Sequence, residues 1–294
     1  MQMAGRKKSK RKNAFAEVLR LLVMAIAVAV LLYSAWQLYS IYHGYHAAGE
    51  EYEKLAEEFT KPGGSEPEVK EPAGTGSGEI PEHSGSTAAV AEEARGLVED
   101  AKPPLTVDWN ALKAVNSEII GWLYVDAQPS ISYPICQGAD NDYYLHRTFR
   151  REEIFAGAIF ADYMNSPDFS DPNTIVYGHN MKNGSMFGML KFLRDQQAYD
   201  AAPYFWILTP DGNYRYHIYA VMNTPLDSEV YTFFDGRGET FLDWEKRMQA
   251  ASDVANDVPL SENDYTVTLS TCTSDSSYRC VVMGKLVSTD HPGK

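Results

Sequence analysis

The chain has 294 residues, of which 44% are hydrophobic, so it can fill a sizeable core and is too apolar to be disordered throughout. Its formal net charge is −14; residues 1–20 carry a net +6, which leaves −20 for the remainder. A surface that follows nucleic-acid phosphates needs clustered Lys and Arg, so this composition excludes nucleic acid as a partner. Three cysteines, with no Cys-x-x-Cys pair, exclude a disulfide-stapled scaffold and a typical structural zinc site.

An uncharged apolar segment, Leu21–Tyr42, follows the basic residues 1–20. Its 22 residues would extend about 33 Å as a helix, against a hydrocarbon core of about 30 Å. The preceding basic cluster predicts a cytoplasmic N-terminus and an extracellular remainder. A cleaved signal peptide is the alternative, but its apolar region is usually about 7–15 residues. The sequence therefore favours an uncleaved transmembrane signal anchor in the cell membrane.

Residues 43–104 are expected to form an extracellular stalk, which opens with a short helical pattern at 50–59. The segment 61–86 is rich in Pro, Gly, Ser and Glu, and this composition buries too little apolar surface to offset the entropy of ordering the chain. We interpret it as a tether. The folded catalytic domain is predicted to occupy 105–294.

This folded part is predicted to be mainly β. Eight short runs rich in β-branched and aromatic residues are separated by turn residues, a pattern typical of a closed or nearly closed barrel. They lie at 121–126, 131–137, 157–162, 174–180, 204–209, 214–222, 265–272 and 279–287. The turn Pro210–Asn213 predicts that the two strands beside it form a hairpin.

Several helices are expected between these strands. Asp108 is placed to cap a short helix that opens the domain. Residues 184–194 and 238–252 each carry an apolar face and are expected to pack on the barrel. The Tyr-rich stretch 142–149 also reads as helical.

Cys272 is the candidate nucleophile. It ends the alternating strand 266–272, and a polar turn at 273–277 precedes the next strand. If the two strands pair, Arg279 returns to the level of Cys272, which would place a cation beside the thiol. A cysteine at a strand end is also often a buried small hydrophobic residue, and the sequence alone leaves that alternative open.

His179 is the candidate base. Four of the seven histidines lie in terminal or stalk segments, and we expect His146 and His217 to be surface or packing residues. His179 follows a buried strand and the flexible Gly178, so its ring should project toward a groove rim. An imidazolium about 4 Å from the thiol would favour the thiolate by roughly 4 kcal/mol before desolvation, at an effective dielectric near 20.

These residues lie in motifs that resemble the sortase family. The motifs are TLSTC (268–272), the Arg of the following strand, and YGHN (177–180). NSEIIGWLYV, ISYPICQG, NDYYL and GHNMKNGSMFGML are similar to class B over about 190 residues from Leu105 onward. The resemblance implies a closed eight-stranded sortase-like β-barrel with an N-terminal helix and a helix inserted before the nucleophile strand.

The resemblance implies a transpeptidase with Cys272 as nucleophile, His179 as general acid and base, and Arg279 as stabiliser of substrate and oxyanion. Such an enzyme cleaves a C-terminal sorting signal of secreted proteins after Thr. The resulting thioacyl enzyme transfers the protein to a peptidoglycan amine. The resemblance implies no metal and no other cofactor.

Four neighbouring residues are expected to bind substrate, namely Ser270, Thr271, Asn180 and Tyr177, and the last two also to orient the imidazole. Two features depart from the family pattern: the separation of seven between Cys272 and Arg279 is short for class B, and Cys280 directly follows the arginine. We expect Cys280 to face away from Arg279.

Two other functions fit the same sequence. A pilin polymerase would use a Lys amine of another pilin subunit as the acceptor. A non-catalytic tethered β-domain would bind an extracellular partner, with Cys272 merely buried.

Overall fold

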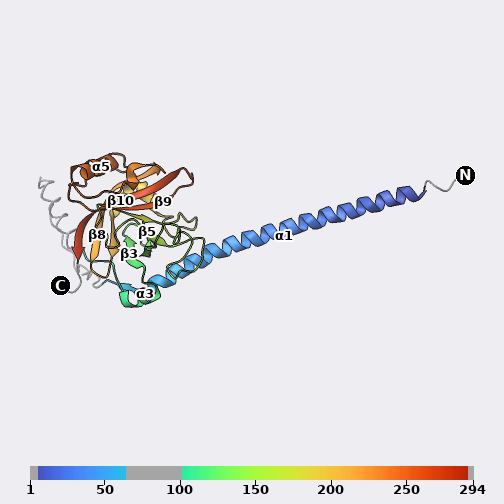
Figure 1. Cartoon of the computed structure of the whole chain (residues 1–294), viewed down its shortest axis with the longest axis horizontal. Helices are drawn as coiled ribbons and strands as arrows, with labels where there is room; N and C mark the ends of the chain where they lie inside the picture. The colour runs from blue at the N-terminus through green and yellow to red at the C-terminus, as the bar shows by residue number, and fades with distance from the viewer. Residues whose placement is uncertain (1–5, 64–100, 291–294) are drawn as a thin grey trace, which may run out of the picture. The chain divides into compact units, whose positions relative to one another are not determined.

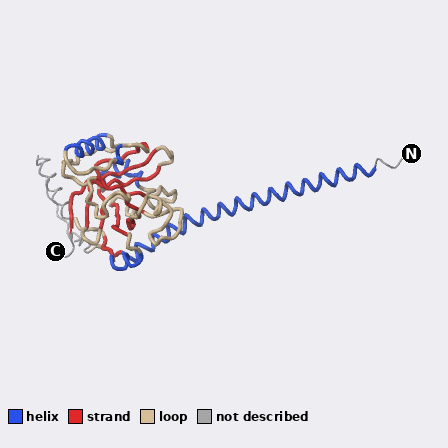
Figure 2. The backbone as a smooth tube through the Cα atoms, in the orientation of Figure 1, coloured by secondary structure: helices blue, strands red, loops and turns tan. Residues whose placement is uncertain are grey.

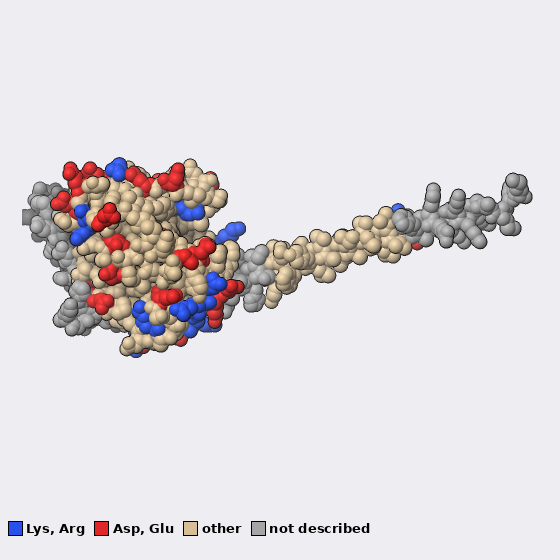
Figure 3. All heavy atoms as spheres, in the orientation of Figure 1, with Lys and Arg blue, Asp and Glu red and all other residues tan. Residues whose placement is uncertain are grey.

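The structure is a computed structural model that describes residues 6–63 and 101–290 and divides into two compact units between Ala48 and Gly49. The helix α1 (Arg6–Phe59) contains a 23-residue segment, Glu17–Tyr39, that is long and apolar enough to cross a membrane by length and composition. Its described side chains are almost entirely uncharged (Figure 3). This segment overlaps the predicted span 21–42, whereas the predicted tether lies mostly outside the described residues.

Eight strands close into a barrel, which confirms the predicted mainly β fold (Figures 1 and 2). Around the barrel the order is β10-β8-β7-β3-β4-β5-β6-β9. The pairs β4–β5 and β6–β9 are parallel, and the other pairs are antiparallel. The strands are β3 (Ile119–Val125), β4 (Ser132–Cys136), β5 (Ile159–Ala161), β6 (Asn173–Tyr177), β7 (Tyr204–Leu208), β8 (Asn213–Pro225), β9 (Thr266–Cys272) and β10 (Tyr278–Asp290).

Burial of the strand side chains accounts for the closure. Every residue of β5 is buried, as are all but the last residue of β6 and of β9, so both faces of these strands are covered. These strands are rich in β-branched residues, which favour a sheet, and this explains why the β6 and β9 segments stand out in the sequence.

The end of α1 packs on the barrel. Tyr52, Leu55 and Phe59 are buried, and the Tyr52 hydroxyl donates to the Gly157 carbonyl over 2.6 Å. The chain then forms β1 (Thr60–Pro62), which pairs with β2 (Leu105–Val107). These contacts lie within the second unit, so residues that we assigned to the stalk pack against the folded domain. The start of the catalytic domain at residue 105 stays a prediction.

Two local predictions are confirmed. Asp108 caps α3 (Trp109–Val115), where its carboxylate accepts from the Ala111 amide over 3.0 Å. The turn at Pro210–Asn213 joins β7 and β8, which pair as an antiparallel hairpin. Both depend on short-range chemistry, which a sequence reveals directly.

Two helix predictions are wrong, one in extent and one altogether. The predicted helix 184–194 is only the 3₁₀ helix η1 (Leu190–Arg194), because Gly184 (φ 85°) and Met186 (φ 54°) adopt left-handed backbone conformations. The stretch 142–149 forms turns rather than a helix. There the buried Tyr144 donates its hydroxyl to Glu118 over 2.5 Å, so tertiary contacts override the local pattern. The short helix α4 (Gln196–Ala201) was not predicted.

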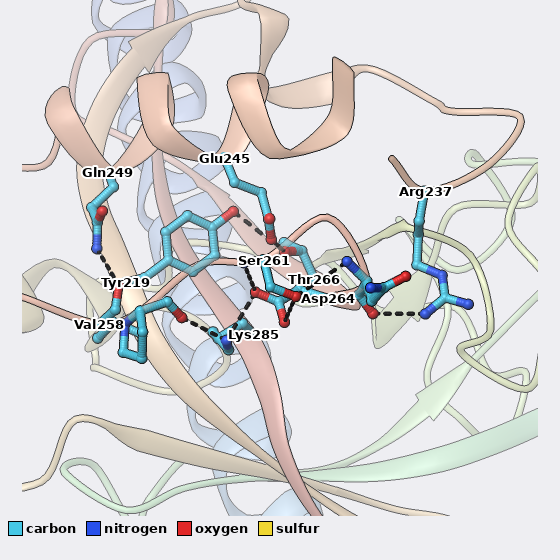
Figure 4. A network of polar contacts seen from close by, with 11 residues as sticks. Tyr219, Arg237, Glu245, Gln249, Val258, Ser261, Asp264, Thr266 and Lys285 are labelled. Atoms are coloured by element: carbon cyan, nitrogen blue, oxygen red, sulfur yellow. Dashed lines mark hydrogen bonds and ion pairs between the residues drawn. The ribbon is translucent and has the colours of Figure 1, made fainter. Parts of the chain in front are cut away.

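The predicted helix at 238–252 is α5 (Glu239–Ala250), in the insert between β8 and β9, preceded by η2 (Glu229–Tyr231). It buries Phe241, Trp244 and Met248, as its apolar face predicts. Polar contacts also join the insert to the barrel (Figure 4): the Thr266 hydroxyl donates to Glu245 over 2.8 Å, and Lys285 pairs with Asp264 over 2.8 Å. The insert is thereby fixed against β9 and β10.

Candidate active site

Cys272 and Arg279 are directly paired Cα partners at the end of the β9–β10 hairpin. Directly opposed residues of an antiparallel pair project from the same face of the sheet, so the thiol and the guanidinium share one side. The guanidinium Nη1 donates to the carbonyl oxygens of Ser276 and Tyr278, each over 3.0 Å. The connecting turn thus holds the cation at the level of the half-buried sulfur, as the sequence predicts.

His179 reaches the same end of the barrel through the parallel pair β6–β9. Tyr177 pairs with Ser270, and the Gly178 amide extends the ladder by donating to the Ser270 carbonyl over 3.2 Å. A Cβ atom on Gly178 would collide with the Ile159 side chain and lie 2.9 Å from Phe187. Glycine is therefore required for the close approach that delivers His179 to the strand end.

Cys272, His179 and Arg279 line one pocket of about 220 Å³. Cys272 and Arg279 come from the β9–β10 hairpin, whereas His179 follows β6, far away in the sequence. Strand pairing therefore brings together a nucleophile, a titratable ring and a permanent cation. The pocket is also lined by Asn141, Leu145, Phe160, Tyr177, Gly178, Ser270 and Thr271.

Several known proteins are similar to this chain in sequence and in fold. The Sortase domain family matches residues 123–287. Sortase B of Listeria monocytogenes is 39% identical over 179 residues, 60% of this chain and 72% of that protein. Sortase B of Clostridium perfringens has a solved structure that is 32% identical and covers 60% of this chain and 98% of its own, with a TM-score of 0.57. A sortase B complexed with triglycine is 27% identical, covering 61% and 85%, with a TM-score of 0.57.

The chain belongs to the sortase family. Its relatives are sortases B, and the enzyme is a cysteine transpeptidase of this type. The long insert between β8 and β9, which carries α5, matches the helix that the class B resemblance places before the nucleophile strand.

The imidazole of this sortase is held by the loop before β5. Its Nε2 atom lies 2.9 Å from the Leu145 carbonyl, and the exposed Phe155 ring stacks on it with centroids 6.0 Å apart. The carbonyl is an acceptor only, so Nε2 carries the proton and Nδ1 is the acceptor in the neutral ring. The expected orienting role of Tyr177 and Asn180 is therefore taken by Leu145.

Burial lowers the pKa of His179, while the Leu145 hydrogen bond opposes that shift and nearby His146 adds to it. Desolvation penalises the imidazolium, so the neutral ring dominates at neutral pH. This weakens the sequence-based expectation of a resting imidazolium that stabilises the thiolate. A neutral imidazole instead fits the role of a base that takes the thiol proton as the sulfur attacks.

The four predicted substrate-binding residues divide between two sides of Cys272. Tyr177, Ser270 and Thr271 line the pocket with the catalytic candidates, and Thr271 also lines a second pocket on the other side of Cys272. Asn180 lies on the other side, where its amide nitrogen donates to the Cys272 carbonyl over 2.8 Å. Asn180 therefore fixes the backbone of Cys272 rather than the imidazole.

Three residues near the site were not predicted. Asp162 is buried and accepts from both Tyr177 and Asn141, over 3.0 and 2.8 Å, which fixes two pocket walls. Tyr231 of η2 shares a hydrogen bond of 2.9 Å with the Ser270 hydroxyl, two residues before Cys272. Asn141 stands in the NDYYL motif and Asp162 ends a predicted strand, but nothing in the sequence places Tyr231 here.

Neither of the other two cysteines lines the pocket that contains His179 and Arg279. All three cysteines are free, and Cys136 and Cys280 are buried. Burial raises the pKa of the Cys280 thiol to about 11, so it stays protonated at neutral pH. Cys280 lines the pocket opposite the one that contains Arg279, so the two neighbours face opposite sides. Among the described residues, no group of three His, Cys, Asp or Glu is placed to hold a metal ion.

Proposed function

We propose that Cys272 is the nucleophile, His179 the general base and acid, and Arg279 the stabiliser of the oxyanion in this cysteine transpeptidase. The observation that carries the proposal is their convergence on one pocket from β9, β10 and the segment that follows β6, with Arg279 paired to Cys272. A guanidinium stays protonated throughout, so it can hold the negative oxygen of a tetrahedral intermediate without losing its charge.

The reaction runs in two halves. In the first, His179 accepts the thiol proton while the sulfur attacks a Thr carbonyl in the sorting signal of a secreted protein. The tetrahedral intermediate collapses, the peptide C–N bond breaks, and the imidazolium gives its proton to the departing amine. In the second, an acceptor amine attacks the thioester, the C–S bond breaks, and a new amide forms.

The acceptor in this proposal is a peptidoglycan amine, which makes the enzyme a wall-anchoring sortase. The family's amine acceptors and the relative complexed with triglycine support an amine as the second substrate. We further propose that Glu17–Tyr39 anchors the enzyme in the cell membrane with its N-terminus in the cytoplasm, as the basic residues before it favour.

Incubation of the full chain in detergent with peptides that contain Pro and Thr tests this function. Intact mass should reveal a thioacyl adduct, and added amines should convert it to a transpeptidation product. Cys272→Ala should form neither while keeping the wild-type thermal transition. Adduct formation by that variant would exclude Cys272 as the nucleophile.

A further inference from the structure

A second pocket borders Cys272. Its volume is about 440 Å³, twice that of the pocket that holds His179 and Arg279. Thr271 and Cys280, which are paired Cα partners, contribute to its wall. They are the sequence neighbours of Cys272 and Arg279, and alternate residues of a strand project from opposite faces. Thr271 and Cys272 line both pockets, whereas Arg279 lines only the smaller one and Cys280 only the larger, so the proposed nucleophile stands between the two pockets.

The charges of this second pocket all have one sign. Its charged lining residues are Lys182, Lys191 and Arg194, with no carboxylate among the lining residues, although the chain has 40 Asp and Glu against 26 Lys and Arg. Arg194 is partly neutralised by Asp253 over 2.6 Å. Lys182 and Lys191 have no ion pair among the described residues. The pocket is thus suited to an anion.

The positive field reaches the wall of the pocket. Arg194 and Lys191 act to lower the pKa of Cys280, against the larger effect of burial and the opposing effect of Asp253. These two cations project from η1, whereas Lys182 follows His179 and Asn180 in sequence. Two separate segments therefore direct their charge toward the same space.

An unpartnered polar group also borders this space. The Thr271 hydroxyl is buried and has no hydrogen-bond partner within the described part of the chain. A buried polar group left unpaired costs free energy, and Thr271 lines this pocket as well as the smaller one. A carboxylate oxygen would accept from this hydroxyl.

We propose that this second pocket selects the acceptor, and that the acceptor is an amine with a carboxylate close to it in the same molecule. The inference rests on the proposed function, because the acceptor must reach a thioester on Cys272. The carboxylate lies among the lysines, and the amine nitrogen attacks the thioester carbon. The nitrogen loses a proton to His179, the C–S bond breaks, and the proton passes to the sulfur, so charge and atoms balance.

Partitioning of the thioacyl enzyme tests this proposal. The full chain in detergent is charged with a sorting peptide, and aminolysis is measured relative to hydrolysis with glycine, glycylglycine and lysine, each as the free acid and as its amide. The acids and amides differ in amine basicity, but that difference is the same for every enzyme variant and cancels when variants are compared.

We expect the preference for acids over amides to fall about 4- to 25-fold in Lys182→Gln/Lys191→Gln, since an exposed charge contact is worth roughly two- to five-fold in affinity. The wild-type preference should also fall as salt is raised. Lys246→Gln, which removes an exposed lysine of α5 outside the pocket, should leave it unchanged. Lys246→Gln should also keep the wild-type rate of thioacyl formation.

Three results would overturn the inference. In the first, the Lys182→Gln/Lys191→Gln variant keeps the wild-type preference for acids over amides. In the second, the Lys246→Gln variant loses that preference. In the third, the wild type prefers phosphoethanolamine to ethanolamine and needs the two lysines to do so, but shows no preference for acids over amides. In each case thioacyl formation would leave the proposed function standing. Absence of any thioacyl enzyme in the wild type would instead remove the proposed function itself.

Discussion

Arg279 lies directly opposite Cys272 in the β9–β10 ladder, although only the turn 273–277 and Tyr278 separate them in the chain. The separation of seven residues, which is short for class B, is thus sufficient for Cys272 and Arg279 to pair directly. The guanidinium is held by main-chain carbonyls of the same turn, so its position depends on local backbone geometry rather than on a carboxylate partner.

Replacement of Arg279 should separate the effects of charge and geometry. Arg279→Met should lower kcat about 10²- to 10³-fold, in line with the loss of one oxyanion donor. Arg279→Lys keeps the charge but not the planar fork, so we expect a loss between those of the wild type and the Met variant. Single-turnover thioacyl formation is the measurement, and near-wild-type rates for Arg279→Met would contradict the assigned role.

Gly178→Ala should damage the site through packing. The added methyl group would press on Ile159 and Phe187, and overpacking typically costs about 1–3 kcal/mol of stability. We expect a lower midpoint in urea and slower thioacyl formation, because His179 is displaced. Gly236→Ala is the matched control, since a Cβ atom there has no neighbour within 4 Å. Equal stability of the two variants would refute this explanation.

Glu245 should make stability fall as pH rises. Burial raises the pKa of this carboxyl from 4.5 to about 8, so its stabilising effect is fully present below pH 4.5 and is lost as pH rises toward 8. Glu245→Gln should flatten this dependence and stabilise the protein at pH 9, by an amount on the order of 4 kcal/mol.

Urea unfolding at pH 5, 7 and 9 measures this effect. Glu262→Gln, which removes an exposed carboxylate, is the matched control. Parallel pH profiles for Glu245→Gln and the wild type would show that the buried carboxyl does not titrate in this range.

Tyr231 and Ser270 should act as a unit on substrate binding. Their hydroxyls share one hydrogen bond beside the nucleophile, so Tyr231→Phe and Ser270→Ala remove the same interaction. We expect each to raise KM for the sorting peptide a few-fold, and the double variant to cost less than the product of the two. If the factors by which the two single variants raise KM simply multiply in the double variant, this double-mutant cycle would exclude the coupling.

The sequence was most informative where chemistry is local. The Asp108 cap, the turn before Asn213 and the strand that ends at Cys272 depend on neighbours in the chain, and all three were predicted correctly. The convergence of His179 on Cys272 depends on the parallel pairing of β6 with β9, two strands far apart in the chain. No short pattern encodes that pairing, and the family resemblance supplied the expectation.

The remaining site features are tertiary. Leu145 acts through a main-chain carbonyl, which every residue has, so its side chain gives no signal. Tyr231 reaches Ser270 because the insert is fixed on the barrel: the Trp244 indole donates to the Glu229 carbonyl over 2.7 Å, and Arg247 pairs with the Glu229 carboxylate over 2.9 Å. These contacts appear only when α5 is in place.

The pairing of β1 with β2 has a consequence for proteolysis. Residues 60–62 and 105–107 are neighbours in one small sheet, and Tyr52, Leu55 and Phe59 are buried in the same unit just before it. A nick anywhere between 64 and 100 would therefore cut the chain without severing the α1 fragment from the enzyme. The two fragments should co-purify under native conditions and separate only in denaturant.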